Sequence, residues 1–253
     1  MELFLAQLVS GLSTGGIYAL LVLGMNLITL VRNVVHHGFS HTCIFTMAVG
    51  WLIYNETGMP WLAFLAMFAA GVLVTVLTEP LFRPLSVRGA DLETIVLAMG
   101  VGIILSELIV NFFNSGQVLS FNDEMKIFTT KFQVGAITVS VASIVALAAC
   151  VVIAIIISTY LFKSSEGRAM RAMAQNLRVA KMLGVPFGKT GVLGFVIAGL
   201  LASCIGVICI MCLGYCNAEM GDSFATKAVI LMLFAGQGDI KGGILSSILM
   251  GVV

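Results

Sequence analysis

The chain is poor in charge. Asp, Glu, Lys and Arg make up only 10% of its 253 residues, and the formal net charge is +1. Hydrophobic residues account for 60% of the sequence, and the mean hydropathy is +1.11. No stretch is polar enough to form a soluble domain, so the composition indicates an integral membrane protein.

Catalytic and nucleic-acid-binding patterns are also missing. The sequence contains no Walker-type phosphate loop, no Ser/His/Asp arrangement with a soluble pocket and no paired carboxylates. No basic patch is interleaved with aromatic residues, as binding of single-stranded nucleic acid would require. We therefore predict that the protein is not an enzyme and binds no cofactor and no nucleic acid. Any ATP hydrolysis would belong to a separate partner subunit.

The six cysteines do not form a recognisable site. All of them lie in apolar segments, and Cys209, Cys212 and Cys216 share one helical face. No neighbouring Asp, Glu or His completes a set of metal ligands. We interpret these cysteines as small hydrophobic residues that fill contacts between helices.

Long uncharged runs predict membrane-spanning helices. The first run extends from Leu3 to Val31 with Glu2 as its only nearby charge, which fits a span and not a cleavable signal peptide. The sequence predicts an all-α fold, a polytopic transmembrane helix bundle in one domain over residues 1–253. About eight spans are expected, the last of them short or truncated at Val253. They lie at 4–30, 38–54, 61–82, 93–112, 136–162, 190–213, 223–236 and from 242 to the end.

The loops between these spans alternate in charge. Ten basic residues lie in one set of loops, at 31–37, 83–92, 163–189 and 237–242. The other set holds two lysines and six acidic residues, at the N-terminus, 55–60, 113–135 and 214–222. The positive-inside rule places the basic loops in the cytoplasm and the N-terminus outside. The polar outer loop 113–135 either contacts an extracytoplasmic binding protein or is a solvated connection.

Residues 163–189, called the hook below, hold six of the thirteen basic residues of the chain. On a helix with about 100° per residue, its arginines fall on one side and its apolar residues on the other. The apolar side comprises Met170, Met173, Leu177, Ala180 and Leu183. Gly184 and Pro186 then predict the end of the helix. Three interpretations fit: a helix that docks a soluble partner, an ordinary positive loop, and a helix on anionic lipid.

The residues of the hook closely resemble the coupling loop of one family. Residues 166–176 read EGRAMRAMAQN, and residues 180–185 read AKMLGV. The inner-membrane permease subunits of branched-chain amino acid ABC transporters carry a similar Gly-x-Ala-x-Arg-Ala-x-Ala pattern followed by Leu-Gly-Ile/Val. The resemblance implies a cytoplasmic coupling helix that docks into an ATP-binding subunit. The matching positions are Gly167, Arg168, Ala169, Arg171, Ala172, Ala174, Ala180, Leu183 and Gly184.

Three further stretches, at 13–28, 79–90 and 227–245, are similar to the same family, so the likeness covers most of the chain. Two prolines in the second stretch predict that a helix ends there at the membrane interface. Asn26, in the first stretch, needs a hydrogen-bond partner inside the bundle. Glycines in or next to the first stretch, and within the third stretch, would permit close helix packing or tight turns. They are Gly11, Gly15, Gly16, Gly236, Gly238 and Gly242.

The stretch 33–41 departs from the family pattern. It reads NVVHHGFSH where the family typically has Asn-Phe-Ala-His-Gly-Glu, so Phe39 replaces an acidic residue. Its three histidines raise a metal hypothesis, but no Asp or Glu is close in sequence and we predict no metal site. They either cap a broken helix at the membrane edge or line a substrate path, as interrupted helices in transporters commonly do. We predict a path that includes Asn26, Asn33, His37, Gly38, Ser40 and His41.

Glu107 is a carboxylate well inside a predicted span, the one at 93–112. A charge at the centre of a membrane costs roughly 3 kcal/mol on insertion scales. The side chain therefore lies near the outer end, faces the bundle or is protonated. A direct role toward substrate stays open.

Together these features predict the permease subunit of an ATP-binding cassette importer in the bacterial inner membrane. Two permease subunits, identical or paralogous, would enclose the path within the membrane lipid. An extracytoplasmic binding protein would deliver the solute, and ATPase subunits would grip the hook. The expected solute is a branched-chain or other hydrophobic amino acid, with nucleosides, simple sugars, urea or amides as the alternative. Rivals of another class are a metal or redox membrane protein and a scaffold without transport activity.

Overall fold

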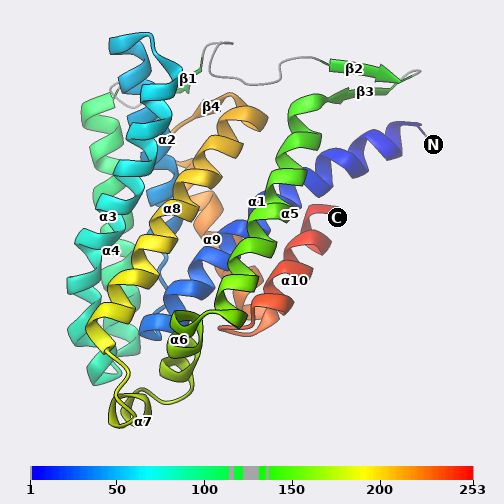
Figure 1. Ribbon diagram of the computed structural model, residues 1–253. Coiled ribbons are helices and arrows are strands. Elements are labelled where there is room, and N and C mark those ends of the chain that lie inside the picture. Colours follow the sequence, from blue (N-terminus) through cyan, green and yellow to red (C-terminus); the bar gives the residue numbers. More distant parts are fainter. Residues whose placement is uncertain (1, 114–116, 122–130, 135–136, 253) are drawn as a thin grey trace.

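The computed structural model describes the chain except for residues 1, 114–116, 122–130, 135–136 and 253 (Figure 1). The described part is dominated by helices that run roughly along one direction, with short strands at one end and the hook at the other. The helices are α1 (Glu2–Arg32), α2 (Gly38–Thr57), α3 (Pro60–Arg88), α4 (Asp91–Phe113), α5 (Val141–Lys163), α6 (Ser165–Gln175), α7 (Leu177–Met182), α8 (Phe187–Leu213), α9 (Met220–Ala235) and α10 (Ile240–Val252).

Five helices are long and apolar enough to cross a membrane: α1 from Gly11, α3, α4 from Leu92, α5 and α8. The prediction of an all-α, multi-pass membrane protein is therefore confirmed. The other three predicted spans correspond to α2, which has 20 residues, and to the shorter helices α9 and α10. α10 is a shorter apolar helix, and α9 has only 16 residues. At 1.5 Å per residue, α9 is about 24 Å long, which is less than a bilayer core of about 30 Å.

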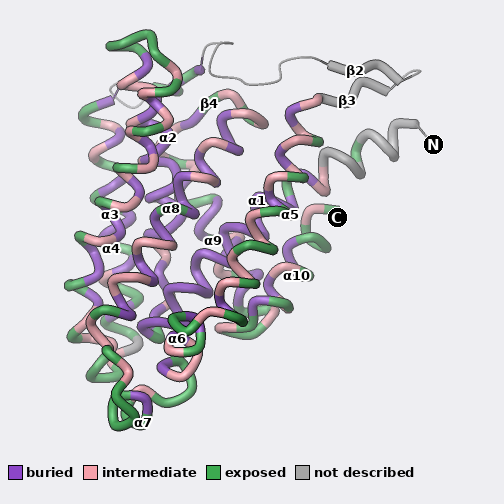
Figure 2. The backbone as a smooth tube through the Cα atoms, in the orientation of Figure 1, coloured by how far each residue is buried: buried purple, intermediate pink, exposed green. Residues whose placement is uncertain are grey.

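α1 forms the centre of the bundle. Of its most apolar window, 94% is buried, compared with 28% for α3 and for α4 and 17% for α5. α1 packs against α5, α8, α9 and α10. Figure 2 shows the same division, because the outer helices carry exposed residues along their length. The exposed side chains on α3, α4 and α5 are largely apolar, as lipid-facing surfaces are.

Small residues allow α1 to approach its neighbours closely. A Cβ atom at Gly15 would lie 3.0 Å from the carbonyl oxygen of Ser247 on α10, and one at Gly11 would overlap the backbone of Gly251. On another side of α1, a Cβ at Gly16 would lie 3.2 Å from Sγ of Cys150 on α5. Such spacing brings backbones together and maximises dispersion contacts, which hold helices together where there is no water to exclude.

The strands lie at the end of the bundle opposite the hook (Figure 1). β1 (Leu119–Ser120) pairs antiparallel with β4 (Tyr215–Cys216), and β2 (Lys131–Val134) pairs antiparallel with β3 (Ile137–Ser140). The prediction that a span begins at residue 136 was wrong, because residues 137–140 form a strand and α5 begins at Val141. Much of the predicted outer loop, at 114–116 and 122–130, lies outside the described residues.

The predicted helix end within the stretch 79–90 is confirmed, but the predicted span 61–82 stops too early. α3 continues through Pro80 and Pro84 to Arg88. Each proline removes one backbone hydrogen bond. Between them, the guanidinium of Arg83 donates to Glu79 one turn earlier, at 2.7 Å and 3.2 Å. This ion pair bridges the weakened turn and helps to keep it helical.

Candidate functional site

The chain is not helical between α1 and α2. Asn33 has φ +54°, the one positive φ among the described non-glycine residues, and residues 34–36 have no regular structure. Five extended residues span at most about 17 Å. The segment 33–37 is therefore long enough to carry the chain back into the bundle before α2 starts.

The start of α2 lies beside the middle of α4. A Cβ atom at Gly38 would lie 2.8 Å from the carbonyl oxygen of Ala98 and 3.1 Å from the amide nitrogen of Gly102. α4 has 23 residues and begins at Asp91, so Gly102 lies about 17 Å along it at 1.5 Å per residue. The N-terminus of α2 is thus about halfway through the bundle, and the interrupted helix predicted from the sequence is present.

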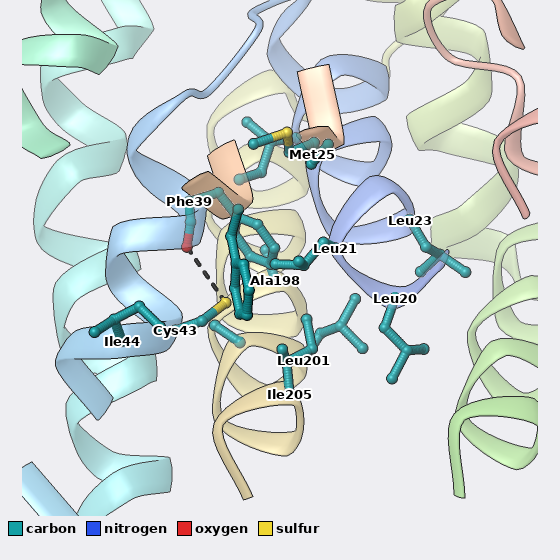
Figure 3. Packing of buried hydrophobic residues seen from close by; sticks show 14 of the residues in the cluster. Leu20, Leu21, Leu23, Met25, Phe39, Cys43, Ile44, Ala198, Leu201 and Ile205 are labelled. Atoms are coloured by element: carbon teal, nitrogen blue, oxygen red, sulfur yellow. Dashed lines mark hydrogen bonds between the residues drawn. The ribbon is translucent and has the colours of Figure 1, made fainter. Parts of the chain in front are cut away.

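Phe39 anchors this N-terminus in the core. Its side chain is fully buried, and its ring occupies the space that a side chain at Gly24 of α1 would need. Figure 3 shows Phe39 beside Leu21 of α1 and Ala198 of α8. One turn later, Sγ of Cys43 donates to the carbonyl oxygen of Phe39 at 3.4 Å. The residue that replaces the family's acid is therefore a packing residue in this chain.

The first turn of α9 meets the first turn of α2. Nε2 of His41 lies 3.1 Å from Oδ1 of Asp222, and the imidazole is 2% exposed while the carboxylate side chain is 74% exposed. Two glycines make room for the ring. A Cβ at Gly102 would lie 2.9 Å from its Nδ1, and one at Gly221 would lie 3.0 Å from its Cγ. The carboxylate of Asp222, oriented by the buried imidazole of His41, thus lies in the middle of the bundle. It faces outward where the N-termini of α2 and α9 meet.

Asp222 was missed as a site residue because it was assigned to an outer loop at 214–222. The structure places it in the first turn of α9, which starts deep in the bundle. A sequence signal exists in retrospect. Only about 16 residues separate Glu219 from Gly236, too few to cross a bilayer from surface to surface, so one end of this helix, with any polar residue there, is expected within the bundle.

The three histidines do not converge on one point. The ring of His36 is buried and lies 4.6 Å from the ring of Phe82 on α3, centroid to centroid. His37 is half-buried, and its ring lies 5.8 Å from that of His41. In the described part of the chain, no group of three His, Cys, Asp or Glu residues is placed to hold a metal ion. Within the same part, Oγ of Ser40 is buried and has no hydrogen-bond partner, so the packing of the described chain leaves this hydroxyl unsatisfied.

Two predicted path residues, Asn26 and Asn33, lie away from His41. Asn26 is fully buried, and its amide accepts from Gly238 N–H at 3.0 Å and donates to the carbonyl of Asp239 at 3.2 Å. It holds the turn between α9 and α10, in which Gly236 and Gly238 have positive φ. Asn33 lines a groove of about 400 Å³ between the end of α1, the hook and this turn. The other lining residues are Thr29, Leu30, Arg171, Ala174, Gln175, Gln237 and Gly238.

Glu107 is exposed on α4, six residues before that helix ends at the strand end of the bundle. Its carboxylate accepts from the amide of Asn111, one turn later, at 3.2 Å. Of the three placements expected for this carboxylate, the structure favours the one near the end of its span.

The hook consists of two short helices, whereas the prediction from the sequence assumed a single helix. The hydroxyl of Ser164 accepts from Gly167 N–H at 2.8 Å and caps α6. Asn176 then ends α6 and caps α7, accepting from the backbone amides of residues 178 and 179 at 3.1 Å each. At the start of α6, the carboxylate of Glu166 accepts hydrogen bonds from the backbone amide of Glu166 and from the side chain of Ser165, and these hydrogen bonds lower its pKa. The polar caps explain the break, since Asn competes for backbone donors inside a helix.

The buried face of the hook agrees only partly with the prediction. Met170, Met173 and Ala180 are buried. Leu183, predicted on the same face, is 78% exposed, because α7 ends at Met182 and Leu183 lies beyond it as the C-cap residue. Together with Val179 and Met182 it forms an apolar tip beside Arg178 and Lys181. Gly184 follows with φ +84°, and the predicted stop is confirmed.

The two arginines at the centre of the family pattern bind the end of α5. Arg168 donates to the carbonyl of Lys163 at 3.0 Å, and Arg171 donates to the carbonyl of Phe162 at 3.3 Å. Such contacts satisfy helix carbonyls that otherwise lack partners. Gly167 packs against the backbone of Leu161. Of the other matched positions, Ala169 and Ala172 are half-buried, whereas Ala174 and Gly184 are exposed.

A buried ionic brace connects the return of the hook to the bundle. Arg32, at the end of α1, pairs with Glu79 of α3, which also pairs with Arg83. The guanidinium of Arg32 lies 4.0 Å from the ring centre of Phe187 at the start of α8, and Lys181 of the hook lies 4.3 Å from the same ring. A side chain at Gly191 would overlap Arg32. The brace therefore links the hook, α1, α3 and α8, and no sequence pattern had indicated it.

Comparisons with known proteins agree with this architecture. A family model described as "Branched-chain amino acid transport system / permease component" matches residues 7–253. The chain is 25% identical to the high-affinity branched-chain amino acid transport system permease protein BraD of Pseudomonas aeruginosa, over 98% of this chain and 84% of that protein. It is 24% identical to LivH, the corresponding permease protein of Escherichia coli K12, with the same coverage.

A relative named for a different transport system matches as well. The autoinducer 2 import system permease protein LsrC of Enterobacter sp. strain 638 is 25% identical over 91% of this chain and 65% of its own length. No solved structure matches the chain.

Proposed function

The chain belongs to the family of branched-chain amino acid transport permease components of ABC transporters, and we propose that it carries branched-chain or other hydrophobic amino acids into the cell. The observation that carries this proposal is the junction of α2 and α9. There the carboxylate of Asp222, paired with His41, lies about halfway through the bundle, next to the buried hydroxyl of Ser40, which has no hydrogen-bond partner among the described residues.

A carboxylate at this depth requires a functional explanation. Ionisable groups inside membranes face water-filled cavities or ligands, because lipid would impose a large desolvation cost. Asp222 faces away from the bundle of this single chain. We propose that a second permease subunit, identical or paralogous, closes this face and that the solute passes between the two subunits past Asp222, His37, Gly38, Ser40 and His41.

The hook suits an ATPase subunit as its partner. Its exposed tip combines Val179, Met182 and Leu183 with two cations, and it lies at the end opposite the strands. The excess of basic residues in the loops at this end supports a cytoplasmic location in a bacterial inner membrane. Because Lys181 and the brace join the tip to α1, α3 and α8, movement of the tip would be transmitted to the start of α2. At the other end, an extracytoplasmic binding protein would deliver the solute.

A sugar-like solute is the second candidate. The likeness to LsrC, a permease protein of an autoinducer 2 import system, favours a polar, hydroxyl-bearing molecule. Nucleosides, urea and amides fit the same polar groups. Competition between labelled leucine and unlabelled solutes in reconstituted vesicles would separate these candidates.

The partner is tested by co-purification. The intact chain should bring an ATPase subunit with it, identified by mass spectrometry, and the variant Met182→Glu/Leu183→Glu should lose it. Ser165→Glu adds a charge to an exposed position of α6, away from the tip, and should retain the partner. Arg168 and Arg171 are unsuitable for this test, because they hold the hook to α5.

If the tip variant retains the ATPase, the docking assignment is wrong. If no ATPase accompanies the folded intact chain, a lipid-binding scaffold explains the hook better. Metal or haem in the purified protein would favour the redox alternative.

A further inference from the structure

A groove of about 540 Å³ lies between α3 and α8 near the hook, on the outside of the bundle. α3 and α8 pack side by side (Figure 1). The groove begins at the first turn of α8 and follows that helix away from the hook. Its lining residues are Arg83, Gly188, Lys189, Val192, Leu193 and Val196.

The end of the groove nearest the hook is basic. Arg83 is 43% exposed there, although it also contacts Glu79, and Lys189 is exposed without an ion pair to any described residue. Behind them, Glu79 already neutralises Arg32. Arg32 and Arg83 thus share one carboxylate, and Lys189 adds a third positive charge nearby. The first turn of α8 adds to this positive potential, since it contains no acidic residue and, within the described part, no side chain caps it.

The rest of the groove is apolar. Val192 and Leu193 lie one turn before Val196 on α8, and Leu200 continues the same face one turn later with 41% of its surface exposed. On α3, Leu73, Leu77 and Leu81 are exposed along the outer surface. These residues belong to the lipid-facing surface of the bundle, so the groove opens to the hydrocarbon and its basic end lies at the level of the headgroups.

We propose that this groove binds one anionic phospholipid. The phosphate would lie between Arg83 and Lys189, and an acyl chain would follow Val192, Leu193 and Val196. Basic pockets between transmembrane helices at an interface recognise lipid headgroups in this way. The charge and the apolar walls commit the site to a lipid, because a free phosphate would use only the basic end. This inference concerns a surface outside the solute path and does not depend on which solute is carried.

The lipid would also affect the brace. Arg83 holds Glu79 in the contact that Glu79 shares with Arg32. A phosphate beside Arg83 and Lys189 offsets the surplus of positive charge around this buried carboxylate. We therefore expect the bound lipid to stabilise the contact between α3 and the return of the hook.

The test is native mass spectrometry of the detergent-purified protein, with any partner subunits, after addition of phosphatidylglycerol or phosphatidylethanolamine with identical acyl chains. The intact protein should retain phosphatidylglycerol with roughly tenfold preference. Arg83→Gln/Lys189→Gln should reduce that preference to about twofold or less. The matched control Arg88→Gln/Lys163→Gln removes two exposed cations at the same end but outside the groove and outside the tip, and should keep the preference.

Two further variants protect the test against misfolding. Lys189→Gln alone leaves the Arg83–Glu79 contact intact and should lose part of the preference. Val196→Phe keeps every charge and fills the apolar part, so it should displace the lipid. Equal retention of both lipids by the intact protein, an unchanged preference in Arg83→Gln/Lys189→Gln, or displacement of the lipid by millimolar inorganic phosphate alone would each overturn the proposal.

Discussion

The hook and the α2–α9 junction differ in how they are built. The hook is local: Ser164 and Asn176 cap its two helices, and Arg168 and Arg171 bind carbonyls no more than nine residues away. The junction is assembled from distant segments, since His41 and Asp222 are 181 residues apart. A local unit can keep its form while it moves against a partner, whereas the junction changes whenever α2 and α9 shift. This contrast suits a hook that receives a signal and a junction that responds to it.

The largest effect is expected from breaking the brace that connects the hook to the bundle. Arg32→Met would leave Glu79 buried with Arg83 as its only cation. Removing one partner of a buried ion pair typically destabilises a protein by about 3–5 kcal/mol. We expect a clearly lower melting temperature in detergent.

Arg88→Met is the control for this variant, because Arg88 is exposed at the end of α3 and exposed charges contribute little to stability. Equal melting temperatures for the Arg32→Met variant and the intact protein would show that the brace does not hold the hook to the bundle.

A smaller effect is expected at the junction. Asp222→Asn keeps the shape of the side chain and removes its charge, and because the side chain is largely exposed, folding should be unaffected. A charge-assisted hydrogen bond contributes about 1.5–3 kcal/mol, so leucine uptake into vesicles containing the complete transporter should fall at least roughly tenfold. Ser223→Ala, at the neighbouring exposed position of α9, should transport normally. Undiminished uptake by Asp222→Asn would remove this carboxylate from the solute path.

The smallest effect is expected within the hook. Asn176→Ala removes the cap of α7 and should cost about 1 kcal/mol of local stability. Hydrogen exchange of the amides of residues 178–182 should become faster, while exchange in α6 stays the same because Ser164 caps that helix separately. Faster exchange throughout 165–182 would show that the two helices form one cooperative unit, contrary to the local construction inferred for the hook.

Much of the architecture could be predicted from the sequence, for identifiable reasons. Runs without charge locate α3, α4, α5 and α8, because burying charge in lipid is costly whatever the tertiary structure. The end of the second helix of the hook, just before Gly184, follows from backbone conformation alone. The misplaced boundaries have local explanations as well. α3 passes its prolines with the help of the Glu79–Arg83 pair, and α5 starts late because Ile137–Ser140 pairs with β2.

What the sequence by itself determined is the class of the protein: a helical membrane bundle, its approximate spans, and a basic hook with the family's pattern. Hydrophobicity and charge are properties of single residues and need no partner to be recognised. Only the tertiary structure decided the functional neighbourhoods. It placed Phe39 in the core, Asp222 beside His41, Asn26 on the α9–α10 turn, and Arg32 with Glu79. Each of these depends on contacts between segments far apart in the chain, which packing selects and local sequence does not encode.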